Sequence, residues 1–221
     1  MKLLTVGDSF TFGEELPDVT SNLTPSQFAW PQLVADRLGY TLNNMAKPGS
    51  GNTRMVRHCV EHVNDYDMAI IAWSHFARIE MADENGFYDL WPGGGTLPHR
   101  AYSQWRWEII EYFTKHHNDD YLYRQYLLNI ILIQNFFKAN NKPYLLLDSF
   151  GNHQVNNRTA DVNKDLLDQI DGRFYVGWPI DTMMEWAYGS EVGPRGHFLE
   201  QGHRQVADKV YNHMVGLGWV N

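Results

Sequence analysis

Cysteines and long apolar runs are scarce in this chain of 221 residues. The single cysteine, Cys59, cannot form a disulfide within the chain, which favours a reducing compartment. No stretch approaches the ~20 apolar residues that cross a bilayer. The first apolar run, which ends at Val6, is cut short by Gly7-Asp8 and is too brief for a signal peptide. We therefore expect a cytoplasmic protein without a membrane span.

Basic residues are also in the minority. The chain has 18 Lys and Arg against 26 Asp and Glu, a formal net charge of −8, which argues against nucleic acid as a partner. The first glycine-containing loop, GDSFTFG, is not the G-x-G-x-x-G fingerprint of dinucleotide-binding proteins. Apolar residues make up 43% of the chain, enough for the core of one domain over residues 1–221.

Predicted strands and helices alternate along this domain. Apolar β-branched runs predict strands, and apolar residues spaced three and four apart predict helices. The expected strands cover residues 2–6, 41–45, 68–73, 144–147 and 174–176, and the expected helices cover 30–38, 53–64, 120–139, 160–170 and 201–217. Such alternation predicts an α/β fold, a three-layer α/β/α sandwich around a five-stranded parallel sheet.

One segment, at about 83–118, interrupts this alternation. It is rich in aromatic residues and contains the turn sequence WPGGG. We expect an irregular insertion with one short helix near 105–113. A loop region of this length inside a compact domain is usually functional.

Small residues follow the first three expected strands, at Ser9, Gly49 and Ser74. In parallel sheets ligands bind beyond the carboxyl ends of the strands, so these residues are candidates for one site. A serine nucleophile needs a base to take its proton and donors for the developing oxyanion. The triplet Gly7-Asp8-Ser9 by itself also fits an ordinary turn.

Three motifs together are more specific than this triplet. The triplet that ends at Ser9 resembles the nucleophile block of the SGNH/GDSL hydrolase family. The sequence NMAKPGSGN resembles the second block, with Asn44 leading and Gly49 in the oxyanion position. The sequence GHFLEQGHRQVA resembles the last block and places the family's histidine at His197. The sequences AKPGSGN and AWSHF are similar to those of an SGNH-type subgroup encoded by large tailed bacteriophages. This resemblance would place the protein in the host cytoplasm or the virion.

The resemblance implies a flavodoxin-like SGNH-hydrolase topology and a serine esterase or acylhydrolase. Ser9 would attack an acyl carbonyl and His197 would act as the base. The N–H groups of Ser9 and Gly49, helped by Ser74, would hold the oxyanion. The substrate would be an acetylated sugar, a lipid or a small ester, and no metal or cofactor is implied.

Two positions depart from the family pattern. The asparagine of the third block is replaced by Ser74, followed by His75, and the aspartate three residues before the histidine is replaced by Pro194. Glu191 is the nearest carboxylate, although its spacing is wrong. We expect Glu191, or a backbone carbonyl, to orient the ring of His197.

Other polar residues are weaker candidates. Asp8, Asn44, His75 and Asp148 are predicted to lie near the strand ends and are candidate substrate contacts. His58 and His62 stand four apart, a spacing that can chelate a metal, but we interpret them as a solvated helix face.

Two alternatives to an enzyme remain: a non-catalytic binding or structural protein that retains the fold, and a flavodoxin-like phosphate-binding protein.

Overall fold

Four parallel strands form the central sheet of the computed structural model, which describes residues 1–84, 86–95, 104–153 and 157–220. The strands are β1 (Lys2–Val6), β2 (Thr41–Asn44), β3 (Met68–Trp73) and β7 (Tyr144–Asp148), in the order β2-β1-β3-β7. The predicted fifth strand at 174–176 is wrong. That segment gives only one parallel bridge, between Tyr175 and Leu146, because the 3-10 turn η1 (Gly172–Phe174) occupies its first residue.

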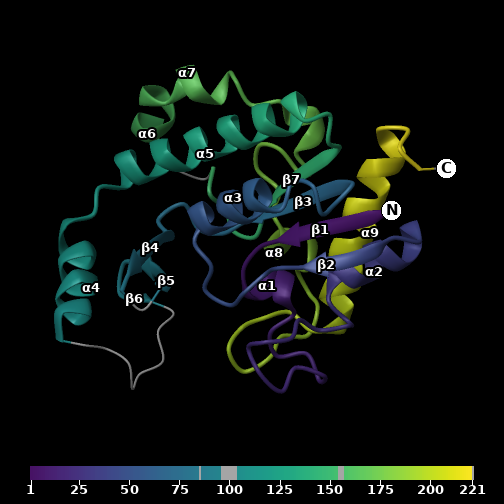
Figure 1. Cartoon of the computed structure of the whole chain (residues 1–221), viewed down its shortest axis with the longest axis horizontal. Coiled ribbons are helices and arrows are strands. Elements are labelled where there is room, and N and C mark those ends of the chain that lie inside the picture. Colours follow the sequence, from purple (N-terminus) through teal and green to yellow (C-terminus); the bar gives the residue numbers. More distant parts are fainter. Residues whose placement is uncertain (85, 96–103, 154–156, 221) are drawn as a thin grey trace.

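Helices cover both faces of this sheet. Successive strand side chains point to opposite faces, so Ile70 packs with the core under α2 (Trp30–Leu38) and α9 (Glu200–Gly216), whereas Ile71 packs with the core under α3 (Asn52–Glu61) and α5 (Asp119–Ala139). The predicted three-layer α/β/α architecture is confirmed (Figure 1).

Shorter helices lie in the connections. The predicted helix at 160–170 is two helices, because Asn163 interrupts it and caps the second. The short helices are α1 (Ser9–Phe12), α6 (Asn157–Val162), α7 (Lys164–Leu167) and α8 (Met183–Trp186). No helix of the described ranges is long and apolar enough to span a membrane.

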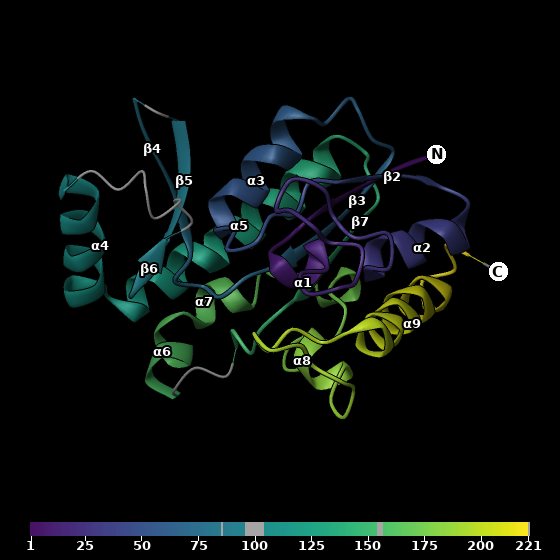
Figure 2. The same ribbon diagram turned by 90° about the horizontal axis from the view of Figure 1, so that it is seen from below.

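The segment predicted to be irregular has regular structure at both ends. β4 (Ile79–Asp83), β5 (Gly86–Trp91) and β6 (Gly94–Gly95) form a small antiparallel sheet, and α4 (Gln104–His116) follows it. This part lies at the end of the molecule opposite the chain termini (Figures 1 and 2). The sequence did not reveal the sheet because its short strands gain their burial from α3 and α4, which are distant contacts. Residues 96–103 of the predicted insertion lie outside the described residues.

A buried histidine joins the two helices on one face of the sheet. His203 of α9 is 1% exposed, and its Nδ1 accepts the N–H of Trp30 at the start of α2, at 3.2 Å. Burial lowers the pKa of His203 to about 3, with a smaller contribution from His197. The ring is therefore neutral in the folded protein at every physiological pH.

This neutral ring predicts a loss of stability in mild acid. The unfolded chain binds a proton on His203 below about pH 6.5 and the folded chain does not, so acid favours unfolding. Between pH 7 and 5.5 the free energy of unfolding should fall by about 1 kcal/mol more in the wild type than in His203→Asn, which keeps an acceptor for Trp30 but cannot ionise. Urea denaturation at both pH values measures this difference. Equal pH dependence in the two proteins would show that His203 ionises normally after folding.

Candidate active site

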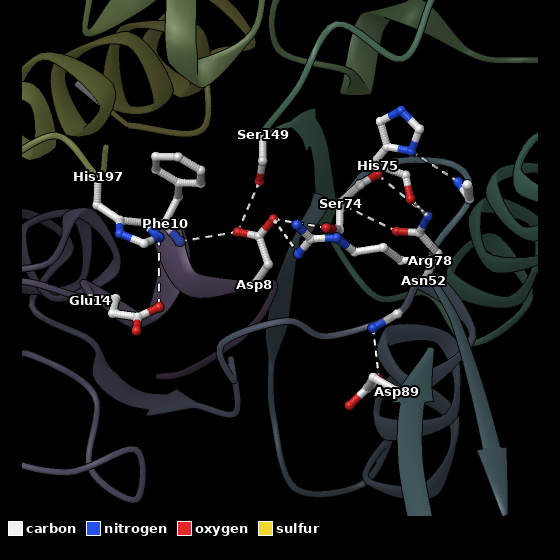
Figure 3. A network of polar contacts seen from close by, with 12 residues as sticks. Asp8, Phe10, Glu14, Asn52, Ser74, His75, Arg78, Asp89, Ser149 and His197 are labelled. Carbon is white, nitrogen blue, oxygen red and sulfur yellow. Dashed lines mark hydrogen bonds and ion pairs between the residues drawn. The ribbon is translucent and has the colours of Figure 1, made fainter. Parts of the chain in front are cut away.

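A buried carboxylate lies at the carboxyl end of the sheet. Asp8 follows β1 and caps α1 by accepting the N–H of Phe10 at 3.1 Å. Its side chain also accepts the hydroxyl of Ser74, after β3, at 2.9 Å and that of Ser149, after β7, at 3.2 Å (Figure 3). Arg78 Nη1 lies 4.0 Å from Asp8 Oδ2. Burial raises the pKa of Asp8, while the Arg78 charge and the three donors act in the opposite direction.

These bonds correct two predictions. Asp8 is fully buried, so it is not a substrate contact. The hydroxyl of Ser74 donates its one hydrogen to Asp8, and the Ser74 N–H donates to Asn52 Oδ1 at 2.9 Å. Ser74 therefore has no free donor for an oxyanion and serves to hold Asp8.

Two asparagines fix the loop that carries Ser74. Asn52 at the start of α3 donates to the carbonyl of His75 at 3.1 Å. Asn152 donates to the carbonyl of Ser74 at 2.8 Å and accepts the N–H of Phe76 at 2.9 Å. Both carboxamides are therefore bonded within the protein, Asn52 to the backbone and to no side chain among the described residues, and Asn152 to the backbone and to the carboxylate of Asp148 at 2.8 Å.

Ser9 is the first residue of α1. It is 6% exposed, and its hydroxyl forms no hydrogen bond with any residue that the structure describes. The next residue, Phe10, packs its ring against His197 with centroids 4.9 Å apart. The contact with His197 is thus made by Phe10, and no hydrogen bond joins Ser9 to His197 among the described residues, so their catalytic pairing stays a prediction.

The ring of His197 is held by a carboxylate that the sequence analysis missed. Glu15 Oε2 lies 2.8 Å from His197 Nδ1 and also accepts the His197 N–H at 3.2 Å, while Oε1 accepts the Arg195 N–H at 2.9 Å. Burial alone would raise the pKa of Glu15, but these donors hold it below its usual value. Glu15 adopts a left-handed backbone conformation with φ 72°, which is uncommon for a residue other than glycine.

Glu15 replaces the predicted orienting group. The Glu191 carbonyl accepts the N–H of Leu199 at 2.9 Å, and none of the interactions found in the described residues joins its carboxylate to His197. The prediction that Glu191 or a backbone carbonyl holds this ring is therefore wrong. The two adjacent carboxylates Glu14 and Glu15, shortly after α1, were the only sequence signal for this role. Their contact with His197 could not be predicted, because Glu15 and His197 are 182 residues apart in the sequence.

The other ring nitrogen faces a second carboxylate. His197 Nε2 lies 3.6 Å from Glu14 Oε2, too far for a hydrogen bond, and Glu14 is paired with Arg195 Nη1 at 2.7 Å (Figure 3). With Nδ1–H donated to Glu15, Nε2 is the nitrogen that can accept a proton. Catalytic hydrogen bonds are often formed only when substrate binds, so this geometry is compatible with a base.

The loop after β2 carries the predicted oxyanion glycine. Gly49 has φ 76°, a left-handed conformation that favours glycine, and its N–H has no acceptor among the described residues. Nearby, the N–H of Gly51 donates to the buried Asp89 of β5 at 2.7 Å. A side chain on Gly51 would meet the backbone of Ile79 in β4 at 2.5 Å. The small sheet therefore fixes the shape of this loop.

Two more predicted substrate contacts have structural roles instead. Asn44 donates to the carbonyl of Thr11 at 3.0 Å and accepts the N–H of Ala46 at 3.1 Å. Asp148 is 3% exposed and accepts hydrogen bonds from Tyr126 at 2.6 Å and Asn152 at 2.8 Å. The second oxygen of Asp148 lies 3.3 Å from His153 Nε2, so the oxygens of both side chains already have partners within the protein.

His75 remains open to solvent. Its Nδ1 accepts the N–H of Ala77 at 3.2 Å, and its ring stacks on Phe76. Burial of the ring edge and the charge of Arg78 lower the pKa of His75, so the ring is neutral near pH 7. Its role as a substrate contact stays a prediction.

One cluster has residue types that fit a transition metal. His58 and Glu61 on α3 and His62 directly after it present ligand atoms within 4.8 Å of one another. Two of them already have partners: Glu61 pairs with Arg57 at 2.8 Å, and His62 Nδ1 lies 3.0 Å from Asp65.

Comparisons with known proteins agree with this architecture. TesA superposes with a TM-score of 0.57 and 14% identity over 98% of this chain and 99% of that one. The psychrotrophic esterase EstA from Pseudoalteromonas sp. gives 0.55 and 11% identity over 99% of both chains. A lipolytic protein of the G-D-S-L family from Desulfitobacterium hafniense gives 0.54 and 11% identity, over 96% of this chain and 98% of that one. The chain therefore has the fold of the SGNH/GDSL hydrolases.

A family model identifies the chain more specifically than its fold does. Residues 14–221 match the model of the family of unknown function DUF6071, and the chain belongs to that family. Among curated proteins, no relative matches the sequence.

The packing of Gly51 gives a prediction about the loop of Gly49. Gly51→Ala should lower the free energy of unfolding by about 1–3 kcal/mol, because the added methyl group cannot fit against the backbone of β4. Gly216→Ala is the matched control, since a side chain there meets nothing within 4 Å. Urea denaturation of both variants measures the effect. If Gly51→Ala were as stable as Gly216→Ala, the contact between the loop and β4 would not be tight.

Proposed function

We propose that the protein is a serine hydrolase that cleaves esters. Ser9 attacks the acyl carbon, and His197 Nε2 takes the proton of its hydroxyl and returns it to the leaving alcohol. Water then attacks the acyl-enzyme with the same base, which regenerates the Ser9 hydroxyl. The substrate is an acetylated sugar, a lipid or a small ester.

The contact between Glu15 and His197 is the observation that carries this proposal. A carboxylate on Nδ1 keeps the hydrogen there, leaves Nε2 as the base and stabilises the imidazolium that forms during attack. Such a carboxylate would take the place of the aspartate that Pro194 replaces in the family pattern. Its side chain is 7% exposed, so water does not weaken the interaction strongly.

Backbone donors are proposed to stabilise the oxyanion. The unpaired N–H of Gly49 and the N–H of Ser9 at the start of α1 are the donors we assign. Because Ser74 and the two asparagines beside it are already bonded, the oxyanion would have fewer donors than the family pattern provides. We therefore expect a modest maximal rate.

A non-catalytic binding protein is the second candidate. It is favoured by the lack of a hydrogen bond between Ser9 and His197 in the described residues and by the position of Glu14 opposite Nε2. In that case Ser9 would have no activated hydroxyl. The hydrolase and the binding protein therefore predict different reactivities for one side chain, the hydroxyl of Ser9.

A serine-directed fluorophosphonate tests this reactivity. We expect stoichiometric labelling of the wild type and none of Ser9→Ala, with hydrolysis of 4-nitrophenyl acetate lost in parallel. Ser21→Ala changes an exposed serine in the loop before α2 and should label as the wild type does. Intact-protein mass spectrometry and peptide mapping identify the site. A wild type that neither labels nor hydrolyses the ester would favour the binding protein.

The role of Glu15 gives a second test. Glu15→Gln should lower kcat/KM by about 100-fold or more, because the amide does not fix the tautomer or stabilise the imidazolium. Glu191→Gln is the matched control and should retain the wild-type rate. Thermal denaturation confirms that both variants are folded. An equal rate in Glu15→Gln and the wild type would exclude Glu15 as the orienting group.

A further inference from the structure

Arg78 is held between two aromatic rings close to Asp8. Its guanidinium lies 5.2 Å from the ring centre of Trp91, at the end of β5, and 5.3 Å from that of Phe150, after β7. These contacts restrain the group in one orientation without using its hydrogen-bond donors. Figure 3 shows the guanidinium directed toward Asp8.

The donors of this guanidinium have no hydrogen-bond acceptor among the described residues. Nη1 is buried without an acceptor, and no hydrogen bond links the Arg78 side chain to another residue in the described part of the chain. At 4.0 Å, Asp8 provides charge compensation but not a hydrogen bond, because the distance is too long for one. An arginine fixed in place with free donors is suited to a planar acid, which it binds through two parallel N–H bonds.

A hollow of about 380 Å³ opens beside this arginine. Arg78, Trp91 and Phe150 line it together with His75 and Phe76. The apolar rings exclude water and so strengthen an ion pair inside the hollow. The hollow also has an acidic lining residue, Asp119, but a ring nitrogen of His117 lies 3.4 Å from its carboxylate.

Packed rings lie between the hollow and the proposed catalytic histidine. Phe150 contacts Phe10 edge-on, with centroids 5.5 Å apart, and Phe10 contacts His197 at 4.9 Å. Phe10 directly follows Ser9 in α1. Arg78 also lies 4.0 Å from Asp8, the residue before Ser9, so a ligand bound to Arg78 would lie close to the segment that carries Ser9.

We propose that this hollow is a subsite for a carboxylate on the substrate, so that the enzyme prefers esters that carry a carboxylate over neutral esters of the same shape. The inference rests on the proposed ester hydrolysis and narrows its substrate class. Arg78 is a binding residue in this scheme, and the bond that breaks remains the ester bond attacked by Ser9.

A matched pair of esters tests the preference. 3-Acetoxybenzoate and 3-acetoxybenzamide release the same acetyl group and differ in one charge. The wild type should show a kcat/KM at least tenfold higher for the benzoate, and Arg78→Gln should bring the ratio of the two values close to one. The ratio within one variant is independent of the fraction of protein that is folded. Arg124→Gln removes an exposed arginine paired with Asp165 and should keep the wild-type ratio.

A conservative variant and a binding assay complete the test. Arg78→Lys keeps a positive charge near Asp8 but cannot form two parallel bonds, so the ratio should fall severalfold even if Arg78→Gln does not fold. The amide 3-acetamidobenzoate, which is not hydrolysed as an ester, should bind at least tenfold more tightly to the wild type than to Arg78→Lys or Arg78→Gln in calorimetry.

The outcomes separate this inference from the proposed function. A ratio near one in the wild type, or a ratio retained in both Arg78 variants, would overturn the carboxylate subsite while ester hydrolysis stands. Binding of 3-acetamidobenzoate that depends on Arg78, without turnover of any ester and without labelling of Ser9, would support the subsite and refute the hydrolase.

Discussion

The buried carboxylate of Asp8 is the interaction on which the site depends. It is fully buried at the carboxyl end of β1 and receives donors from α1 and from the segments after β3 and β7. A charge in such a place is costly unless its oxygens are hydrogen-bonded. The strand ends therefore have to meet at one point, and that requirement positions Ser9, the loop of Ser74 and the loop of Phe150 relative to one another.

The contact of Glu15 with His197 joins the two ends of the chain in a similar way. Glu15 has an unfavourable backbone conformation, with φ 72°, which costs of order 1–3 kcal/mol. Three hydrogen bonds from Arg195 and His197 offset that cost. Such strain persists only where the surroundings determine it, and here it turns the Glu15 carboxylate toward the ring.

The sequence predicted the features that local patterns determine. Helices α2, α3, α5 and α9 and the four strands of the central sheet follow from apolar periodicity, and the motifs at Ser9, Gly49 and His197 indicated the SGNH/GDSL fold. It did not predict Glu15, because the distance of a carboxylate from His197 along the chain says nothing of its distance in space. The small sheet of β4 to β6 was missed for the same reason, and the assignment of Ser74 failed because its bond to Asp8 depends on how the strand ends converge.

Ser74 and Ser149 donate hydrogen bonds to Asp8, so this carboxylate does not require hydrogen bonds from Arg78. If positions 74 and 149 carried apolar residues, the buried carboxylate would lose two of its three donors and would need hydrogen bonds from the guanidinium itself. With both hydroxyls in place, the arginine supplies only charge at 4.0 Å. Ser74, which departs from the family's asparagine, is thus a donor to Asp8, and its bond to that carboxylate is consistent with the proposed carboxylate subsite at Arg78.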